Sequence, residues 1–422
     1  MRSRTDKKIF SSEQARQPTN KKIFGFSRNV FFLGLTSLFT DISTEMIYPL
    51  IPIFLTTILG APVAIVGLVE GIAESTASIL KVFSGWLSDR LRGRKKLTVI
   101  GYGLAALGKP ILALSFVWWE VLIARFVDRS GKGVRTSPRD ALIADSTRKE
   151  EYGRSFGLHR GMDTLGAAFG PLFAFAVLPL LHNNFRVYFS LAIIPASIGV
   201  AVLALFVKEK ARTIKPTSIK LSLKPFNRSF KLFLLVVLVF TIGNSSDAFL
   251  ILRARNVGIT IGLIPLVYFV FSMIYAVAAT PIGSLSDRIG RKTVIIAGYL
   301  IFSLVYLGFA LVKSPFAVWL LFAAYGLYYA FTEGIFKAFT ADIVPANLRG
   351  TAYGFLNLAL GIALLPASLI AGFLWDKINP SAPFFFGSVI SLLALILFIL
   401  LIPGDGRKRL PHEIEGLPEA DI

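Results

Sequence analysis

The chain contains no cysteine, and its three histidines, His159, His182 and His412, are scattered along it. Without cysteine there is no disulfide, no catalytic thiolate and no cysteine metal site. The histidines also lack the close spacing that metal ligands need. A G-x-x-x-x-G-K-[S/T] loop is absent, so the chain supplies no ATP site of that type. No set of nucleophile, base and orienting residues stands out either. The sequence therefore predicts neither an enzyme nor a protein that carries a cofactor.

Acidic residues are the scarcer charged class, with 25 Asp and Glu against 45 Lys and Arg and a formal net charge of +20. A surplus of this size can indicate a nucleic-acid partner. Its distribution indicates membrane topology instead, because most Lys and Arg fall in the tails and in every second loop. The positive-inside rule then places both termini in the cytoplasm and removes the reason to expect nucleic acid as a partner.

Hydrophobic residues form 54% of the chain, and they gather in runs of about 20, the length that crosses a bilayer. Hydropathy predicts twelve spans, at residues 29–58, 62–86, 97–117, 119–143, 156–181, 185–207, 231–253, 258–284, 293–312, 315–341, 350–375 and 382–402. We therefore expect an all-α, multi-pass protein of the cytoplasmic membrane, in contact with lipid. The first run is too long for the apolar part of a signal peptide, so residues 1–28 are expected to remain as a cytoplasmic tail.

A polar, basic segment at residues 208–230 separates the first six spans from the last six. It predicts a boundary between a first bundle at 29–207 and a second at 231–402, followed by a cytoplasmic tail at 403–422. The segment either lies against the anionic inner leaflet or is a plain solvated linker.

Short patterns recur in the two halves at a nearly constant offset. G-W-L-S-D-R at Gly85 recurs as G-S-L-S-D-R at Gly283, 198 positions later. A-L-I-A-D, which ends at Asp145, recurs as A-F-T-A-D ending at Asp342, 197 positions later, and S-F-G recurs as A-Y-G at the same offset. Such constant offsets indicate an internal duplication. A parallel repeat of six-span units is an architecture of secondary transporters.

A run of charged residues, 125–140, falls where the fourth span is expected. On a helix, one line holds Arg125, Arg129, Lys132, Thr136 and Arg139, flanked by Asp128 and Asp140. Charged groups at membrane depth are costly, so this stripe must face a wet cavity or paired acids. The alternative, a surface helix of a soluble domain, does not fit the apolar runs on either side.

Acidic residues also fall inside the expected spans, and five of them are candidates for proton coupling: Asp41, Glu45, Asp163, Asp247 and Glu333. One account makes such acids partners in structural pairs, for example Glu333 with Lys337, and Asp128 with Arg125 or Arg129. The other makes them carboxylates that take up a proton when substrate occupies their basic partner. Asp41 and Glu45 are the best candidates, since they lie one turn apart on the first span. Glu70 and Glu74 repeat this spacing on the second span, where we expect them to face water or an external vestibule.

The repeated G-x-L-S-D-R-x-G-R-K loop resembles the signature loop of the major facilitator superfamily. Its gate residues are Gly85, Asp89, Arg90, Gly93, Arg94, Gly283, Asp287, Arg288, Gly290 and Arg291. A loop aspartate is suited to lie against a helix N-terminus. In a six-plus-six arrangement we expect Asp89 to face residues 349–352 and Asp287 to face residues 154–156.

Two further motifs carry the same resemblance. Arg125 stands where the superfamily has its fourth-span arginine, and G-A-A-F-G-P at 166–171 resembles the fifth-span motif of its proton antiporters. The chain departs from the pattern at an extra Arg92, at Arg129 in place of a glycine, and at 172–173, where a glycine pair is usual. The resemblance covers the first to the twelfth span and implies two six-helix bundles around a central cavity, working by alternating access.

The basic stripe and the family resemblance together favour transport over the other classes. The residues expected to line the substrate cavity are Arg125, Asp128, Arg129, Lys132, Arg139 and Lys337. They favour a small anionic solute as substrate, moved with protons by a monomeric protein. R-T-S-P-R-D-A-L-I-A-D is similar to a bacterial branch in which some members are linked to siderophore traffic. The alternative is a broad drug/proton antiporter, an exporter in which nearby acids neutralise the basic residues. A channel would show a pore-lining ring, which nothing in the sequence suggests.

Overall fold

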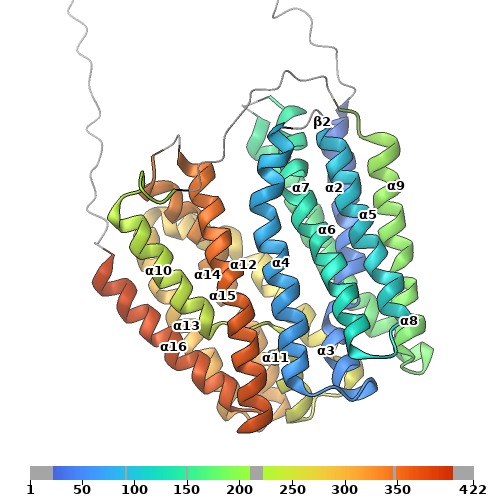
Figure 1. The fold of residues 1–422 in the computed structure, drawn as a ribbon, viewed down its shortest axis with the longest axis vertical. Coiled ribbons are helices and arrows are strands. Elements are labelled where there is room, and N and C mark those ends of the chain that lie inside the picture. Colours follow the sequence, from blue (N-terminus) through green and yellow to red (C-terminus); the bar gives the residue numbers. More distant parts are fainter. Residues whose placement is uncertain (1–21, 91–92, 149–150, 210–221, 346–347, 403–422) are drawn as a thin grey trace, which may run out of the picture.

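A computed structural model describes residues 22–90, 93–148, 151–209, 222–345 and 348–402, without the side chain of Asp89. Long helices running side by side make up the molecule (Figure 1). They are α2 (Arg28–Glu45), α4 (Val63–Arg90), α5 (Arg94–Ala113), α6 (Trp118–Asp145), α7 (Tyr152–Val177), α8 (Phe185–Leu191), α9 (Ile193–Phe206), α10 (Arg228–Gly243), α11 (Ala248–Val257), α12 (Ile264–Ile289), α13 (Arg291–Leu311), α14 (Pro315–Ile343), α15 (Arg349–Lys377) and α16 (Ala382–Leu401). Shorter elements are β1 (Lys22–Ile23), β2 (Phe26–Ser27), η1 (Tyr48–Leu50), α3 (Ile51–Ile53), η2 (Phe54–Ile58), η4 (Pro179–Leu181) and η5 (Ile261–Leu263).

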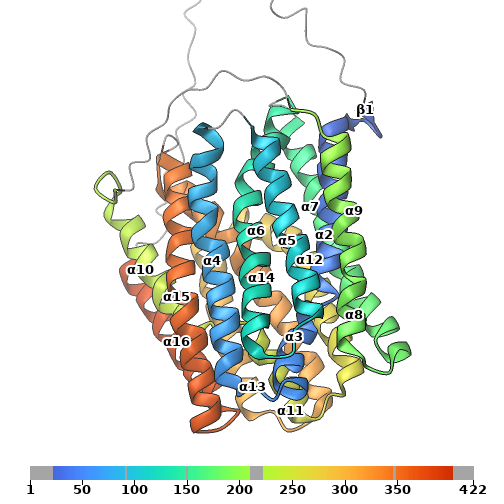
Figure 2. The same cartoon turned by 45° about the vertical axis from the view of Figure 1, so that its right-hand side comes forward.

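Within the described residues, ten helical segments are long and apolar enough to cross a membrane. They correspond to all the expected spans except the third and fourth. At those two places the structure has α5 and α6, which lie among the other helices (Figure 2) and have spanning lengths of 20 and 28 residues. Their charged side chains keep them below the hydropathy of the other ten. In α6 most of these charges point to the protein interior rather than outward.

Glycines allow the closest helix contacts. A Cβ on Gly67 of α4 would lie 2.2 Å from the carbonyl oxygen of Ser368 on α15, and one on Gly372 would lie 2.6 Å from Cα of Ala64. At the same end, the Asp376 carboxylate accepts hydrogen bonds from the backbone N–H groups that begin α4, at 3.2 and 2.7 Å. This contact between α4 and α15 joins segments on either side of residues 210–221, and so does the contact of α7 with α12.

The two ends of the helix bundle differ. We call the end where α4 and α12 finish, at the top of Figure 1, the signature-loop end. At the opposite end the interior is filled by apolar side chains, among them Ile51 and Phe54, which are fully buried, and α3 packs against α11. The rings of Tyr48 and Tyr268, 5.5 Å apart, lie between this apolar region and the middle of the molecule.

Two helices that hydropathy predicts as continuous are interrupted. The span expected at 29–58 breaks after α2 and resumes as η1, and the span expected at 231–253 breaks between α10 and α11 at residues 244–247. Adding the repeat offset of 198 to residues 46–49 gives 244–247, so the breaks are equivalent positions in the duplicated pattern. Interrupted helices leave backbone groups free at membrane depth, which is tolerated only where they are buried in protein or line a cavity.

Candidate functional site

A cavity of about 760 Å³ lies between the helices, and both interruptions border it. It extends from Tyr48 and Asp247 toward Asp140 and Phe156, near the signature-loop end. Its acidic lining residues are Asp41, Glu45, Glu74, Asp140, Asp163, Asp247 and Glu333. Its basic lining residues are Lys81, Arg129, Lys132, Arg135, Arg139, Arg160 and Lys337. The two sets are equal in number, so the formal charges of the described lining cancel.

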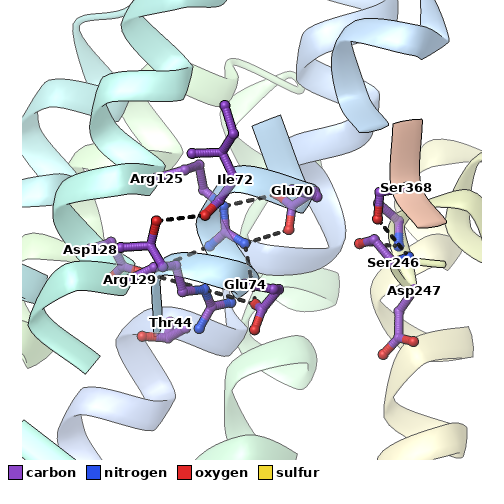
Figure 3. Close-up of polar contacts among 12 residues, drawn as sticks. Thr44, Glu70, Ile72, Glu74, Arg125, Asp128, Arg129, Ser246, Asp247 and Ser368 are labelled. Atoms are coloured by element: carbon purple, nitrogen blue, oxygen red, sulfur yellow. Dashed lines mark hydrogen bonds and ion pairs between the residues drawn. The ribbon is translucent and has the colours of Figure 1, made fainter. Parts of the chain in front are cut away.

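A buried ionic network lies beside this cavity, between α4, α5 and α6 (Figure 3). The guanidinium of Arg125 donates from Nε to Oε1 of Glu70 at 2.8 Å and from Nη2 to Oε2 at 2.5 Å. One turn further along both helices, Nε of Arg129 lies 3.0 Å from Oε1 of Glu74. The two pairs form because residues 70 and 74 share one face of α4, and residues 125 and 129 share one face of α6.

Asp128 completes this network. Nζ of Lys109 lies 2.7 Å from its carboxylate, and Arg125 and Arg129 lie 3.6 and 3.8 Å away. Lys109 also donates to the Thr44 hydroxyl at 3.3 Å. The network therefore contains three acids and three bases. The expected pairing of Asp128 with Arg125 or Arg129 is present, and the stronger partner is Lys109.

The expectation that Glu70 and Glu74 face water was wrong for Glu70, whereas Glu74 lines the cavity. The Glu70 side chain is fully buried against Arg125, and that of Glu74 is 27% exposed and paired with Arg129. Hydropathy alone cannot reveal this, because it does not show which face of α4 packs against α6. Arg125 and Asp128 are thereby held away from the cavity, and they are not among its lining residues. Arg129, Lys132, Arg139 and Lys337 do line it.

Three of the lining bases are lysines from three different helices: Lys81 on α4, Lys132 on α6 and Lys337 on α14. Within the described residues, no carboxylate lies at ion-pairing distance from any of their amines. Lys81 interacts electrostatically with Lys132 and Lys337, and also, beyond ion-pairing distance, with the carboxylates of Glu74 and Glu333. Lys81 was not among the cavity candidates, since its place near a span end suggested a side chain that reaches for the lipid surface.

The expected pair of Glu333 with Lys337 is not formed. Glu333 instead accepts a hydrogen bond from the Tyr275 hydroxyl at 2.5 Å and lies 3.9 Å from Arg160. Arg160 also donates to the Tyr275 hydroxyl at 3.0 Å. These contacts join α7 to α12 and α14 across the cavity. Arg139, in contrast, lies 2.9 Å from the neighbouring Asp140.

Two acidic candidates, Asp41 on α2 and Asp163 on α7, lie side by side and share a hydrogen bond. A hydrogen bond between two carboxyl groups requires that one of them holds a proton. Asp163 also accepts from the Ser37 hydroxyl and lies 3.4 Å from Arg160. The helices approach closely here because of Gly166, where a Cβ would lie 2.5 Å from the Leu38 carbonyl oxygen. The G-A-A-F-G-P motif thus brings the two acids together.

The remaining two acidic candidates sit near the interrupted helices. Glu45 ends α2, and its Oε2 atom is buried without a hydrogen-bond partner among the described residues. Asp247 precedes α11 and accepts hydrogen bonds from the hydroxyls of Tyr325 and Tyr329, at 2.7 and 3.2 Å. These tyrosines belong to a Y-G-L-Y-Y run at 325–329, which the sequence analysis missed. The only sequence signal for them is that their spacing places both on one face of a helix with Glu333.

The two signature loops make equivalent ion pairs. Nη1 of Arg94 lies 2.6 Å from Asp145, and Arg291 bonds to Asp342, each residue 197 positions after its counterpart. Asp287 hydrogen-bonds to Arg291 at 3.0 Å and is largely exposed. Among the described residues, no hydrogen bond or ion pair joins Asp287 to residues 154–156, and the predicted contact stays a prediction.

The other gate candidates lie near these pairs. Gly85 on α4 lies close to Ser137, Gly283 and Arg288 are on α12, and Arg90 lies over the ring of Trp86. Gly93 and Gly290 immediately precede α5 and α13, and Gly290 has a positive φ of 93° that favours glycine. The Asp89 side chain lies outside the described residues, so its predicted contact with 349–352 stays a prediction.

Apolar spanning helices around a charged cavity, together with ion pairs repeated in two loops, define a multi-pass membrane transport protein. The chain belongs to the Major Facilitator Superfamily, which it matches over residues 33–255 and 232–419. The resemblance seen in its loops is thereby confirmed, and the chain is a transporter rather than an enzyme.

Relatives and solved structures extend this result. The chain is 38% identical over 399 residues to the MFS-type transporter MJ1317 of Methanocaldococcus jannaschii, covering 92% of this chain and 99% of that one. It is 23% identical over 398 residues to the multidrug resistance protein MdtH of Salmonella arizonae, covering 92% of this chain and 96% of that one. Its fold is similar to a crystal structure of the human organic anion transporter MFSD10, with a TM-score of 0.64, 18% identity and coverage of 90% and 100%. Its fold is also similar to the crystal structure of a POT family transporter in complex with 5-aminolevulinic acid. The TM-score is 0.74 and the identity 14%, with coverage of 91% of this chain and 98% of that one.

Proposed function

We propose that this protein is a secondary active transporter that moves a small anionic solute across the cytoplasmic membrane, coupled to protons. The observation that carries the anionic substrate is the set of three lysines, Lys81, Lys132 and Lys337, whose amines face the cavity without ion-pairing carboxylates among the described residues. Their ammonium groups repel one another, and a bound anion would relieve that repulsion.

The lysines also suggest how binding could couple to movement. Lys81 and Lys132 are on helices that precede residues 208–230, whereas Lys337 is on a helix that follows them. An anion that bridges them would draw the two sets of helices together. A ligand of this kind favours a closed cavity, because it binds that state better than an open one.

The topology that goes with this function has twelve spans, with α5 and α6 as the third and fourth. The spans form two six-helix bundles, 29–207 and 231–402, joined by the cytoplasmic linker 208–230. Both tails, 1–28 and 403–422, lie in the cytoplasm in this proposal, and the protein acts as a monomer. The basic residues at the signature-loop end support this orientation through the positive-inside rule. The cavity then extends toward the cytoplasm in the present conformation.

For proton coupling we propose Asp41, which shares a hydrogen bond with Asp163. The pair already requires one proton, and uptake or loss of that proton changes the charge of the cavity wall by one unit. Glu45, one turn away with an unpartnered buried oxygen, is the second candidate.

Inside-out vesicles containing the full chain provide the test. A panel of organic anions and cations is offered while a pH-sensitive dye reports proton movement. We expect dye responses to anions from the parent and weaker responses, at the same protein level, from Lys132→Gln. Lys96→Gln is the matched control, since Lys96 is exposed and outside the cavity. Responses only to cations, unchanged in Lys132→Gln, would rule out the anionic substrate.

A second function, drug/proton antiport, is supported by a different observation. The acidic and basic lining residues are equal in number, so a neutral or cationic compound meets no net charge barrier. The relative MdtH carries the name of a multidrug resistance protein. In the same vesicles, this function predicts proton movement on addition of lipophilic cations and no effect of Lys132→Gln.

A further inference from the structure

Asp247 lies on the cavity wall at the interruption between α10 and α11. Its carboxylate accepts hydrogen bonds from two neutral hydroxyls, those of Tyr325 at 2.7 Å and Tyr329 at 3.2 Å. It occupies the N-cap position of α11, yet its side chain makes no capping hydrogen bond. Within the described residues it forms no ion pair with any Lys or Arg. A carboxylate held by neutral donors on a cavity wall keeps its charge available for a ligand.

A series of aromatic rings begins at the two tyrosines that donate to this carboxylate. The ring of Tyr329 lies 5.3 Å from that of Tyr325 and 5.1 Å from that of Phe271, which in turn lies 5.2 Å from the ring of Tyr268. Three of these rings, those of Tyr268, Phe271 and Tyr329, line the cavity. In the described part of the chain, no guanidinium or ammonium lies over any of them, whereas Arg125 and Arg129 both lie over Tyr48 nearby.

The chemistry that fits this surface is an ammonium group. A cation is attracted to the faces of aromatic rings, and this attraction grows when water is excluded. A carboxylate at the same place adds a charge-assisted hydrogen bond, which is stronger than a neutral one. We propose that Asp247, with the rings of Tyr268, Phe271 and Tyr329, binds an ammonium group of the transported solute.

This inference rests on the proposed function for the other end of the solute, which would bind at Lys81, Lys132 and Lys337. The solute is then dipolar, with an anionic group at the lysines and an ammonium group at Asp247. Asp247 follows residues 208–230 in the chain, whereas Lys81 and Lys132 precede them. The solute would therefore span the two sets of helices.

Matched probes test the two ends separately. Short straight-chain ω-amino acids, graded in length, are compared with alkanoates and alkylamines of the same lengths. Binding to the purified full chain in detergent is measured by calorimetry. We expect the best ω-amino acid to bind about tenfold or more tightly than its alkanoate, the gain typical of one hydrogen bond to a charged group. In Asp247→Asn this preference should disappear while alkanoate affinity stays unchanged, because the asparagine carbonyl still accepts from both tyrosines.

A second variant guards against misfolding of the first. Phe271→Leu keeps an apolar side chain but removes a ring face, so it should weaken the amine-bearing probes and leave alkanoates unaffected. If no amine-bearing probe binds the parent, or if both variants keep the parent's preference, the ammonium site is refuted. If alkylamines bind in an Asp247-dependent way but alkanoates do not bind, the ammonium site stands and the anionic substrate fails. If alkanoates bind and the amine adds no affinity, the anionic substrate stands and the ammonium site is refuted.

Discussion

The guanidinium of Arg125 and the carboxylate of Glu70 form a two-bond ion pair in the interior, at 2.8 and 2.5 Å, with 3% and 0% of their side chains exposed. The pair joins α6 to α4, and in the described part of the chain the other carboxylates at ion-pairing distance from Arg125, those of Glu74 and Asp128, belong to the same network. Arg125 is therefore placed to hold helices together, whereas the lysines further along the cavity are placed to meet a solute. Arg125 and the cavity lysines therefore have different roles, although the sequence alone did not distinguish them.

Breaking this pair should destabilise the protein strongly. Glu70→Gln removes the carboxylate that accepts both short hydrogen bonds of the buried guanidinium and leaves only Asp128 at 3.6 Å and Glu74 at 3.9 Å. Breaking a buried pair typically costs about 3–5 kcal/mol. We expect a clear fall in the thermal unfolding temperature in detergent. Glu151→Gln is the matched control, because Glu151 pairs with Lys22 at the exposed surface, where pairs contribute about 0–1 kcal/mol. Equal melting of the two variants would show that the Arg125 pair is not structural.

Removing Arg129 should also act on stability more than on binding. Its Nε lies 3.0 Å from Glu74, and its side chain is 4% exposed. Arg129→Gln therefore leaves Glu74 only the more distant Arg125, at 3.9 Å. Lys132→Gln removes a charge that has no ion-pair partner among the described residues. We expect Arg129→Gln to lower the unfolding temperature while Lys132→Gln does not. In calorimetry with alkanoates, Lys132→Gln should cause the larger loss of affinity. The opposite order in the two measurements would contradict this assignment.

Hydropathy predicted the ten spans at which the described residues form long apolar helices, because it depends on local patterns. It could not show which acids meet which bases, because those pairings depend on how helices rotate against one another. Glu70 illustrates the point, since its helical spacing was read correctly but its partner was not. Interruption of the first and seventh spans was also missed, because hydropathy is unaffected by a short non-helical turn. The tyrosines that hold Asp247 were missed, because nothing in the sequence connects their hydroxyls with that carboxylate on another helix.

Proton dependence should be lost in Asp41→Asn. Asparagine keeps the shape and a hydrogen bond to Asp163 but holds no exchangeable acid proton, so net transport should no longer respond to a proton gradient. Exchange of solute across proteoliposomes should continue. Asp140→Asn is a suitable control, since Asp140 lines the same cavity but pairs with Arg139. If Asp41→Asn and Glu45→Gln both accumulate solute against its gradient as the parent does, the first span does not carry the proton.

The equivalent pairs at the signature loops should help to set the balance between conformations. Each pair, Arg94 with Asp145 and Arg291 with Asp342, holds the start of one helix to the end of the next at the signature-loop end. We infer that they stabilise the present conformation, in which the cavity extends toward that end. Since their carboxylates are partly exposed, each pair contributes at most about 1 kcal/mol. Neutralising one aspartate should thus change the populations by no more than about fivefold.

Cysteine labelling can measure this shift, because the native chain contains no cysteine to remove. A single Ser272→Cys places a thiol on the cavity wall. Adding Asp145→Asn should slow its labelling from the signature-loop side, and Asp342→Asn should do the same, because the two pairs are equivalent. The exchange Arg94→Asp with Asp145→Arg restores opposite charges and should restore the parent rate. Labelling that stays at the parent rate in both single variants would show that the pairs do not bias the conformation.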